Sequence, residues 1–136
     1  MQKIIYNQDV MGFITFFESM THTGVRDCIE GQQLIFVVDS GNMGRAIGRQ
    51  GSNVKRLEQA LNRKIKIVEF NPLATEFVKN LISPLRADVS EEDGTILLSS
   101  NDTRTKSLLI GRNSQNLENY ESIVRRYFGD KKLRVG

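Results

Sequence analysis

Several kinds of residue are scarce in this chain, and each scarcity excludes a class of protein. Cys28 and His22 are the only cysteine and the only histidine among 136 residues, which excludes an intrachain disulfide and a multi-cysteine metal site. Tryptophan is absent, and only two residues are proline. No run approaches the ~20 apolar residues of a membrane span, and the N-terminus does not resemble a secretory signal. We therefore expect a cytoplasmic protein with no metal, no cofactor and no membrane contact.

No group of residues has the composition of a catalytic site. Cys28 lies in a predicted strand with no histidine placed to activate it, so we expect a small core residue. The acidic residues 91–93 lie in a predicted hairpin turn, where carboxylates are normally just solvated. The sequence therefore predicts no catalytic residue and a protein that is not an enzyme.

Positive charge is concentrated in two segments, although the net charge is only +3. Residues 45–66 hold seven basic residues and a single acid, Glu58, and residues 125–134 hold five more basic residues. Clusters of this kind are compatible with binding to a polyanion, while the net charge alone does not demand it.

Hydrophobic periodicity and turn residues predict the same succession of elements in each half of the chain. Asp93-Gly94 is a strong hairpin turn. The predicted helices cover 7–20, 73–82, 103–111 and 116–127, with another from residue 52, and the predicted strands cover 25–29, 33–38, 64–70, 86–90, 95–100 and 131–135. The sequence therefore predicts an α+β fold of two helix–strand–strand–helix–helix–strand units, at 1–71 and 72–136.

The two halves align with a constant shift of 63 residues and no gap. This shift places Leu34 on Leu97, and it places the Gly48-Arg49 step on Gly111-Arg112. Further matched pairs are Gly31 with Gly94, Asp39 with Asp102, Ile47 with Ile110, Asn53 with Asn116, and Glu58 with Glu121. Chance rarely keeps a turn, a strand and a glycine step in one register, so we predict an internal duplication.

The segment GRQG, residues 48–51, lies between two predicted helices. It has neither the Gly-Lys-Ser/Thr ending of a P-loop nor the glycine spacing of a dinucleotide-binding loop. Two such glycines allow a close backbone approach, and the following helix directs its free N–H groups at the loop. A capping turn between helices would also explain the glycines. The basic helix after the loop, the hairpin before it and the repeat favour a clamp on the backbone of about four nucleotides.

Three segments resemble a known family. VRDCI, FVVDSGNMGRAIGRQGSNVKRLE and FVKNLISPL are similar to the archaeal NusA-like transcription termination/antitermination factors, which contain tandem type II KH domains. The resemblance covers nearly the whole chain. It implies two KH domains of the order α-β-β-α-α-β, each with helices packed on one face of a three-stranded sheet, and single-stranded RNA as the partner.

The resemblance also implies where RNA would be bound. The first loop is Gly48, Arg49, Gln50 and Gly51, and the expected contacts beside it are Arg45, Ile47, Asn53, Val54, Lys55 and Arg56. The basic residues would bind phosphates, and a groove beside Ile47 and Val54 would receive bases.

The second loop departs from this pattern. It consists of Gly111, Arg112, Asn113 and Ser114. Ser114 replaces the second glycine, and its Cβ penalises a positive φ and close approach. Glu118 and Asn119 stand where the first copy has two basic residues. We therefore expect the second unit to bind RNA more weakly or to act mainly as a packing partner.

The family further implies a role in transcription elongation, termination or antitermination, with RNA polymerase or other transcription factors as candidate partners of a monomer. Two alternatives stay open. A KH module of ribosome assembly or RNA processing would share the same RNA-binding physics without the polymerase. A KH fold used as a protein-interaction scaffold would have no affinity for RNA.

Overall fold

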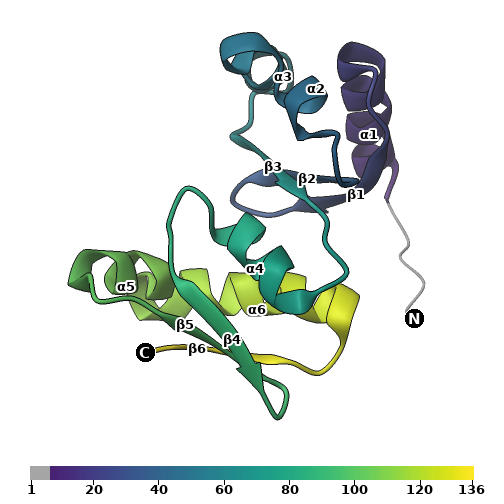
Figure 1. Ribbon diagram of the computed structural model, residues 1–136. Coiled ribbons are helices and arrows are strands. Elements are labelled where there is room, and N and C mark those ends of the chain that lie inside the picture. Colours follow the sequence, from purple (N-terminus) through teal and green to yellow (C-terminus); the bar gives the residue numbers. More distant parts are fainter. Residues whose placement is uncertain (1–6) are drawn as a thin grey trace. The chain divides into compact units, whose positions relative to one another are not determined.

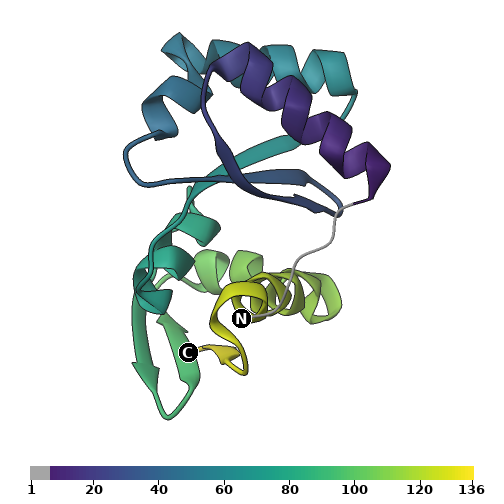
Figure 2. The ribbon, with the colours of Figure 1, turned by 90° about the vertical axis from the view of Figure 1, so that its right-hand side faces the viewer.

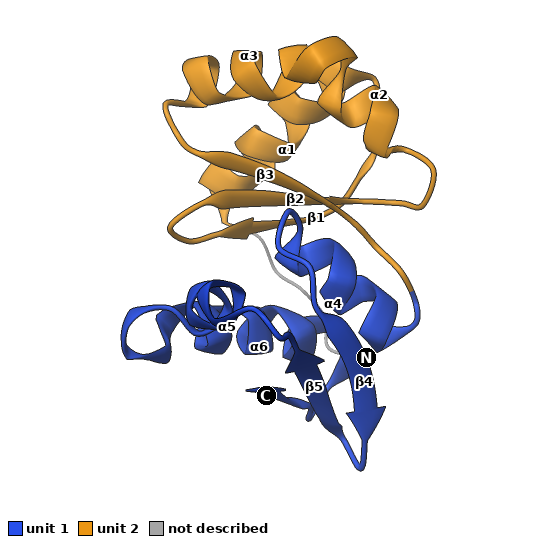
Figure 3. Cartoon of the chain, turned by 60° about the vertical axis from the view of Figure 1, so that its left-hand side comes forward, with its two compact units in different colours: residues 1–2, 72–136 blue, residues 3–71 orange. Residues whose placement is uncertain are grey.

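The computed structural model describes residues 7–136 and divides into two compact units, whose boundary lies between Asn71 and Pro72. Figure 3 colours the N-terminal unit orange and the C-terminal unit blue. Each unit has a sheet of three strands and its own set of helices.

The described part of the N-terminal unit has the order helix–strand–strand–helix–helix–strand. Its elements are α1 (Gln8–Thr21), β1 (Val25–Glu30), β2 (Leu34–Val38), α2 (Met43–Ile47), α3 (Ser52–Leu61) and β3 (Ile65–Glu69), with a 3₁₀ turn at Arg49–Gly51 between α2 and α3. β2 lies in the middle of the sheet, antiparallel to β1 and parallel to β3. The helices lie on one face of this sheet (Figures 1 and 2).

The C-terminal unit repeats this order. Its elements are α4 (Ala74–Ile82), β4 (Asp88–Glu92), β5 (Thr95–Ser99), α5 (Thr103–Ile110), α6 (Gln115–Phe128) and β6 (Lys132–Val135), with a 3₁₀ turn at Arg112–Ser114. β5 is central, antiparallel to β4 and parallel to β6. The predicted α+β fold and its element order are confirmed, with element ends that shift by one or two residues.

The first helix begins and ends where its local chemistry dictates. The Asn7 side chain accepts a hydrogen bond from the Val10 N–H at 2.8 Å, the usual way to satisfy a free N–H at a helix start. His22 ends α1 in the left-handed conformation, and its N–H donates to the Glu18 carbonyl. The Glu18 carboxylate accepts from the Val25 N–H at 2.8 Å, which ties the end of α1 to the start of β1.

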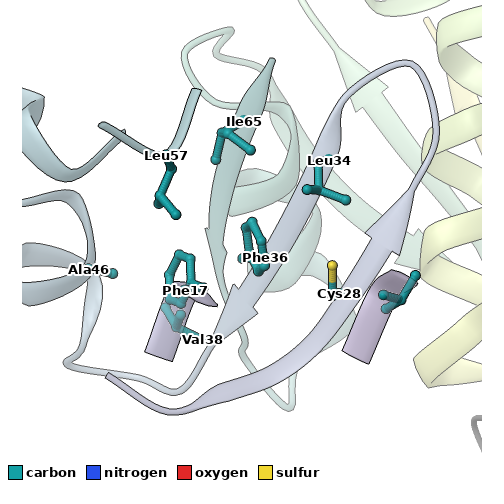
Figure 4. Close-up of a cluster of buried hydrophobic side chains, with 9 residues drawn as sticks. Phe17, Cys28, Leu34, Phe36, Val38, Ala46, Leu57 and Ile65 are labelled. Atoms are coloured by element: carbon teal, nitrogen blue, oxygen red, sulfur yellow. The ribbon is translucent and has the colours of Figure 1, made fainter. Parts of the chain in front are cut away.

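The core of the N-terminal unit holds α2 and α3 against the sheet. Phe17 of α1 stacks on Phe36 of β2 with ring centroids 4.3 Å apart. Ala46 of α2 and Leu57 of α3 are fully buried in the same cluster (Figure 4). Cys28 is buried there too, so its predicted place in the core is confirmed. Because α2 and α3 are both anchored in this core, the segment between them is held at both ends.

The core of the C-terminal unit is built around Phe77 of α4, which is fully buried. Its ring lies edge-on to Tyr127 of α6 with centroids 5.3 Å apart, a favourable aromatic geometry. From the sheet, β5 contributes Ile96 and Leu98, both fully buried. These contacts pack α4, α6 and the sheet together.

The repeat is real, but the gapless alignment is wrong in the strands. The first hairpin leaves three residues between the paired Glu30 and Leu34, whereas the second leaves only Asp93-Gly94 between its paired residues. Leu34 pairs with Ile65, whose N–H donates to the Glu58 carboxylate, and Ile96 pairs with Leu133, whose N–H donates in the same way to the Glu121 carboxylate. Leu34 therefore corresponds to Ile96 and not to Leu97.

The physical reason is the period of a strand. A shift of one residue moves a side chain to the opposite face of a sheet. Ile96 is fully buried and Leu97 is not. One expectation about the second hairpin also needs correction, since Glu91 and Glu92 belong to β4 and only Asp93 and Gly94 form the turn.

Candidate nucleic-acid interface

The segment Gly48–Gly51 forms a tight connection between α2 and α3. The Gly48 N–H donates to the Gly44 carbonyl at 3.0 Å and closes α2, and the Gly51 N–H donates to the Gly48 carbonyl at 3.2 Å. Gln50 has φ 55° and ψ 29°, and Gly51 has φ 74° and ψ 20°. Two successive left-handed residues thus turn the chain directly into α3.

Gly48 is required for a further reason. Its φ of 79° and ψ of 171° lie in a region that is essentially reserved for glycine. A Cβ at this position would also lie 2.8 Å from Ser52 Oγ and 2.9 Å from Asn53 Cγ. Gly51 has no neighbour that a Cβ would meet, so only its positive φ favours glycine there.

The start of α3 is open toward an anion. Gly51 occupies the N-cap position and provides no side-chain hydrogen bond. The first N–H groups of a helix lack internal partners and carry the positive end of the helix dipole. The Ser52 N–H donates to the Arg49 carbonyl. No side chain caps the N–H groups that follow it, so a phosphate oxygen would be favoured there.

Four basic side chains surround this segment. They are Arg45 on α2, Arg49 in the turn, and Lys55 and Arg56 on α3, and all four are exposed. None of them forms an ion pair with another residue of the described chain. Their charge is therefore available to an external anion.

The second basic cluster of the sequence is different. Arg125 pairs with Glu121 at 3.3 Å, and its Nε donates to the Lys131 carbonyl. Lys131 in turn pairs with Glu91. These two side chains make contacts within the C-terminal unit, so the density of basic residues in a sequence does not by itself locate a binding surface.

The connection that leads into α2 is held by two contacts, one to Asp39 and one to Gly41. Arg26 of β1 pairs with Asp39 at 3.0 Å and lies 3.9 Å above the ring of Phe70. The Gly41 N–H donates to the Glu69 carboxylate at 3.1 Å. Strands β1 and β3 thus both hold the segment that places α2.

Three other predicted RNA contacts have distinct surroundings. Ile47 and Val54 are half-buried, and Val54 packs against the core. Asn53 is also half-buried, and its side-chain Nδ2 donates to the Arg45 carbonyl at 3.1 Å. The amide of Asn53 is therefore engaged within the protein.

The second loop has nearly the same backbone. Gly111 has φ 75° and ψ 175°, Asn113 has φ 55° and ψ 33°, and Ser114 has φ 62° and ψ 19°. Ser114 thus adopts the left-handed conformation in spite of its Cβ, at a cost of about 1–2 kcal/mol. Its hydroxyl does not cap α6, although serine is a favoured N-cap in the extended conformation.

The surroundings of the second loop carry less free positive charge. Arg112 is exposed and, within residues 7–136, forms no ion pair. Leu108, which is 44% exposed, occupies the position of Arg45 under the 63-residue shift. The sequence comparison of the two loops did not include this replacement of Arg45 by Leu108. The 63-residue shift would have revealed it, because it aligns the two positions.

Two further basic residues, both in α5, were not singled out from the sequence as candidate RNA contacts. Arg104 and Lys106 have no counterpart in the first copy, where the shift places Gly41 and Met43. Asp102 lies just before them. A hydrogen bond from the Thr105 hydroxyl, 2.7 Å long, lowers the pKa of the Asp102 carboxyl. The acid partly offsets the added positive charge.

Residues 7–136 contain no group of three or more histidine, cysteine or acidic side chains that could hold a metal ion. Over the same residues, no helix has the length and apolar character needed to cross a membrane.

The order α-β-β-α-α-β, the mixed three-stranded sheet and the G-x-x-G turn between two helices together define a KH fold. The family model for the KH domain matches residues 14–82. A protein of Halobacterium salinarum, named probable transcription termination protein NusA, is 35% identical over 119 residues, covering 85% of this chain and 86% of that protein. The chain therefore belongs to the KH-domain family, among the archaeal NusA proteins.

Further relatives agree with this assignment. The protein of the same name from Methanocaldococcus jannaschii is 27% identical over 141 residues, covering 99% of this chain and 76% of that protein. The crystal structure of APE1850 has a TM-score of 0.76 and 28% identity, and covers 96% of this chain and all of that one.

Proposed function

We propose that this protein is a non-enzymatic factor that binds single-stranded RNA and acts in transcription elongation, termination or antitermination. The observation that carries the proposal is the first loop. There, the start of α3 has no side-chain cap, Gly51 leaves room for a close approach, and four exposed basic side chains form no ion pair within residues 7–136.

The chemistry of this surface suits a polynucleotide backbone better than a free nucleotide. The helix start provides one anion site at the turn, and the basic residues extend from α2 to α3 on both sides of it. A loop of this kind contacts the backbone of about four nucleotides in KH domains. The half-buried Ile47 and Val54 are the apolar surfaces on which bases would rest.

The role in transcription is supported by the relatives, which are named probable transcription termination proteins. On this basis RNA polymerase, or a factor bound to it, is the expected protein partner. If the protein instead co-purified with ribosomal subunits and not with polymerase, the same RNA-binding surface would belong to ribosome assembly or RNA processing.

The central test changes the two exposed residues inside the first loop. Arg49→Asp with Gln50→Asp adds negative charge where phosphates would lie, so affinity for a short single-stranded RNA should fall by more than tenfold. Because both side chains are exposed, the melting temperature should stay nearly unchanged. Fluorescence anisotropy and thermal unfolding measure the two effects.

The matched control changes Arg112 and Asn113 to aspartate in the second loop. Its backbone is nearly the same, so any general effect of two added acids is reproduced there. The loss of affinity should be smaller. An equal or larger loss at the second loop would reverse the proposed ranking, and unchanged affinity after the change at the first loop would reject that loop as the RNA site.

A further inference from the structure

An asparagine bridges the two helices behind each loop. Asn53 of α3 donates from Nδ2 to the Arg45 carbonyl of α2 at 3.1 Å. Asn116 of α6 makes the same bond to the Leu108 carbonyl of α5 at 2.8 Å. Both bonds span eight residues and cross a G-x-x-G or G-x-x-S turn. The same bond occurs in two units with different surface chemistry, which indicates that it serves the structure of the turn.

The bridge depends on the first glycine of each loop. A Cβ on Gly48 would lie 2.9 Å from Asn53 Cγ and 3.0 Å from its Nδ2. A Cβ on Gly111 would lie 2.6 Å from Asn116 Cγ and 2.7 Å from its Nδ2. The amide thus fills the space that any other residue's side chain would need, and the glycine and the asparagine form one unit.

The bonded carbonyl is one that the helix cannot satisfy alone. The last four carbonyls of a helix have no internal partner, and Arg45 lies in the last turn of α2. α2 has only five residues, far fewer than an isolated helix needs in order to persist. The Asn53 amide therefore joins a short helix, which has little stability of its own, to the first turn of α3.

We propose that Asn53 is a positioning residue, whose amide holds the Gly48–Gly51 turn in its RNA-binding conformation before RNA arrives. This inference rests on the proposed function of the first loop. It gives Asn53 a role other than direct contact with RNA. Without the bridge, α2 and α3 can rotate about two glycines, and RNA must then order the turn at the expense of affinity.

The test compares Asn53→Ala with Asn116→Ala. Each change removes one equivalent bond, so both should lower the melting temperature to a similar, small extent. Only Asn53→Ala should weaken binding to a short single-stranded RNA, by about five- to tenfold, which is the effect of one lost hydrogen bond. Asn116→Ala should change affinity less than about twofold.

A second measurement separates positioning from contact. Amide hydrogen exchange in the RNA-free protein should become faster in Asn53→Ala at Gly48 and Gly51, whose N–H groups are hydrogen-bonded in the turn, because the turn then opens more often. The slope of affinity against salt should stay that of the wild type, because no phosphate contact is lost. Weaker RNA binding with unchanged amide exchange would make Asn53 a direct RNA contact. Faster amide exchange with unchanged RNA affinity would show that the order of the turn does not affect RNA binding. Either result overturns the proposal.

A second pair of variants covers the case in which the alanine variants fail to fold. Asn53→Asp keeps the shape of the side chain and replaces the donor by an acceptor that faces the Arg45 carbonyl, and Asn116→Asp reproduces the same added charge at the other loop. The exchange measurement needs no RNA. If the wild type fails to bind RNA, the proposed function fails while the bridge is still tested. If Arg49→Asp with Gln50→Asp abolishes binding and the Asn53 variants leave it intact, the bridge proposal alone fails.

Discussion

The two loops share a backbone and differ in what surrounds it. Gln50 and Asn113 have the same φ of 55°, and the residues that follow them are both left-handed although one is glycine and the other serine. Around the first loop the basic residues are exposed and unpaired within the described chain, whereas the second has lost several of them. The same turn therefore forms with either glycine or serine at its last position, and we expect the surrounding charge to decide whether it binds RNA.

The largest effect is expected when the shared backbone is broken. Gly48→Ala forces an L-residue into a region with φ 79° and ψ 171° and pushes its Cβ against Asn53. The free energy of unfolding of the N-terminal unit should fall by about 2–3 kcal/mol, and RNA affinity should fall by more than tenfold because the bridge and the turn are both displaced. Urea unfolding followed by NMR in each unit, with anisotropy for RNA, measures both.

The counterpart is Gly111→Ala. Its Cβ would lie even closer to its asparagine, at 2.6 Å from Asn116 Cγ, so the C-terminal unit should be destabilised at least as much. RNA affinity should nevertheless change little. If this variant lost as much RNA affinity as Gly48→Ala at the same stability, the two loops would contribute equally to binding. The proposal that the first loop is the main RNA site would then be wrong.

Local patterns explain what could be predicted from the sequence. The order of helices and strands follows from periodicity and turn residues, and the Asp93-Gly94 turn follows from its preference for positive φ, 51° and 80° in the structure. The pairing of Leu34 with Ile65 could not be read in this way. Strand register depends on contacts between distant segments, and the matching of Gly31 with Gly94 concealed a hairpin that is one residue shorter.

The positions around the first loop could likewise be predicted, but not the direction of each side chain. Asn53 precedes two basic residues at the start of a helix, where a polar side chain would ordinarily be assigned to the ligand. Its amide turns inward because Gly48 leaves room for it, and this depends on the three-dimensional path of the turn.

A smaller effect is expected from exchanging the charges of the two loops. Lys55→Glu with Arg56→Asn gives the first loop the residues of the second. If both side chains contact phosphates, the salt slope should fall by about 1.4 and affinity at low salt by about tenfold. Anisotropy titrations at several salt concentrations give both quantities. An unchanged salt slope would show that these two residues lie off the RNA path.

The reciprocal exchange tests whether the second backbone is competent. In a protein with Arg49→Asp and Gln50→Asp, the changes Leu108→Arg, Glu118→Lys and Asn119→Arg place basic residues around the second loop. Because that loop has nearly the same backbone angles, part of the lost affinity should return. If none returns, Ser114 or the shape of the surface limits the second loop, and charge is not the deciding difference.

The smallest effect is expected at the residue that most visibly distinguishes the loops. Ser114 holds φ 62°, which costs an L-residue about 1–2 kcal/mol, while glycine adds about 0.4–1 kcal/mol of freedom to the unfolded chain. Ser114→Gly should therefore raise the stability of the C-terminal unit by at most about 1.6 kcal/mol, and Gly51→Ser should lower that of the N-terminal unit by a similar amount. RNA affinity should hardly change with Ser114→Gly, because the turn already has the required backbone and still lacks the basic residues. A large gain in affinity would instead assign the difference between the loops to the second glycine.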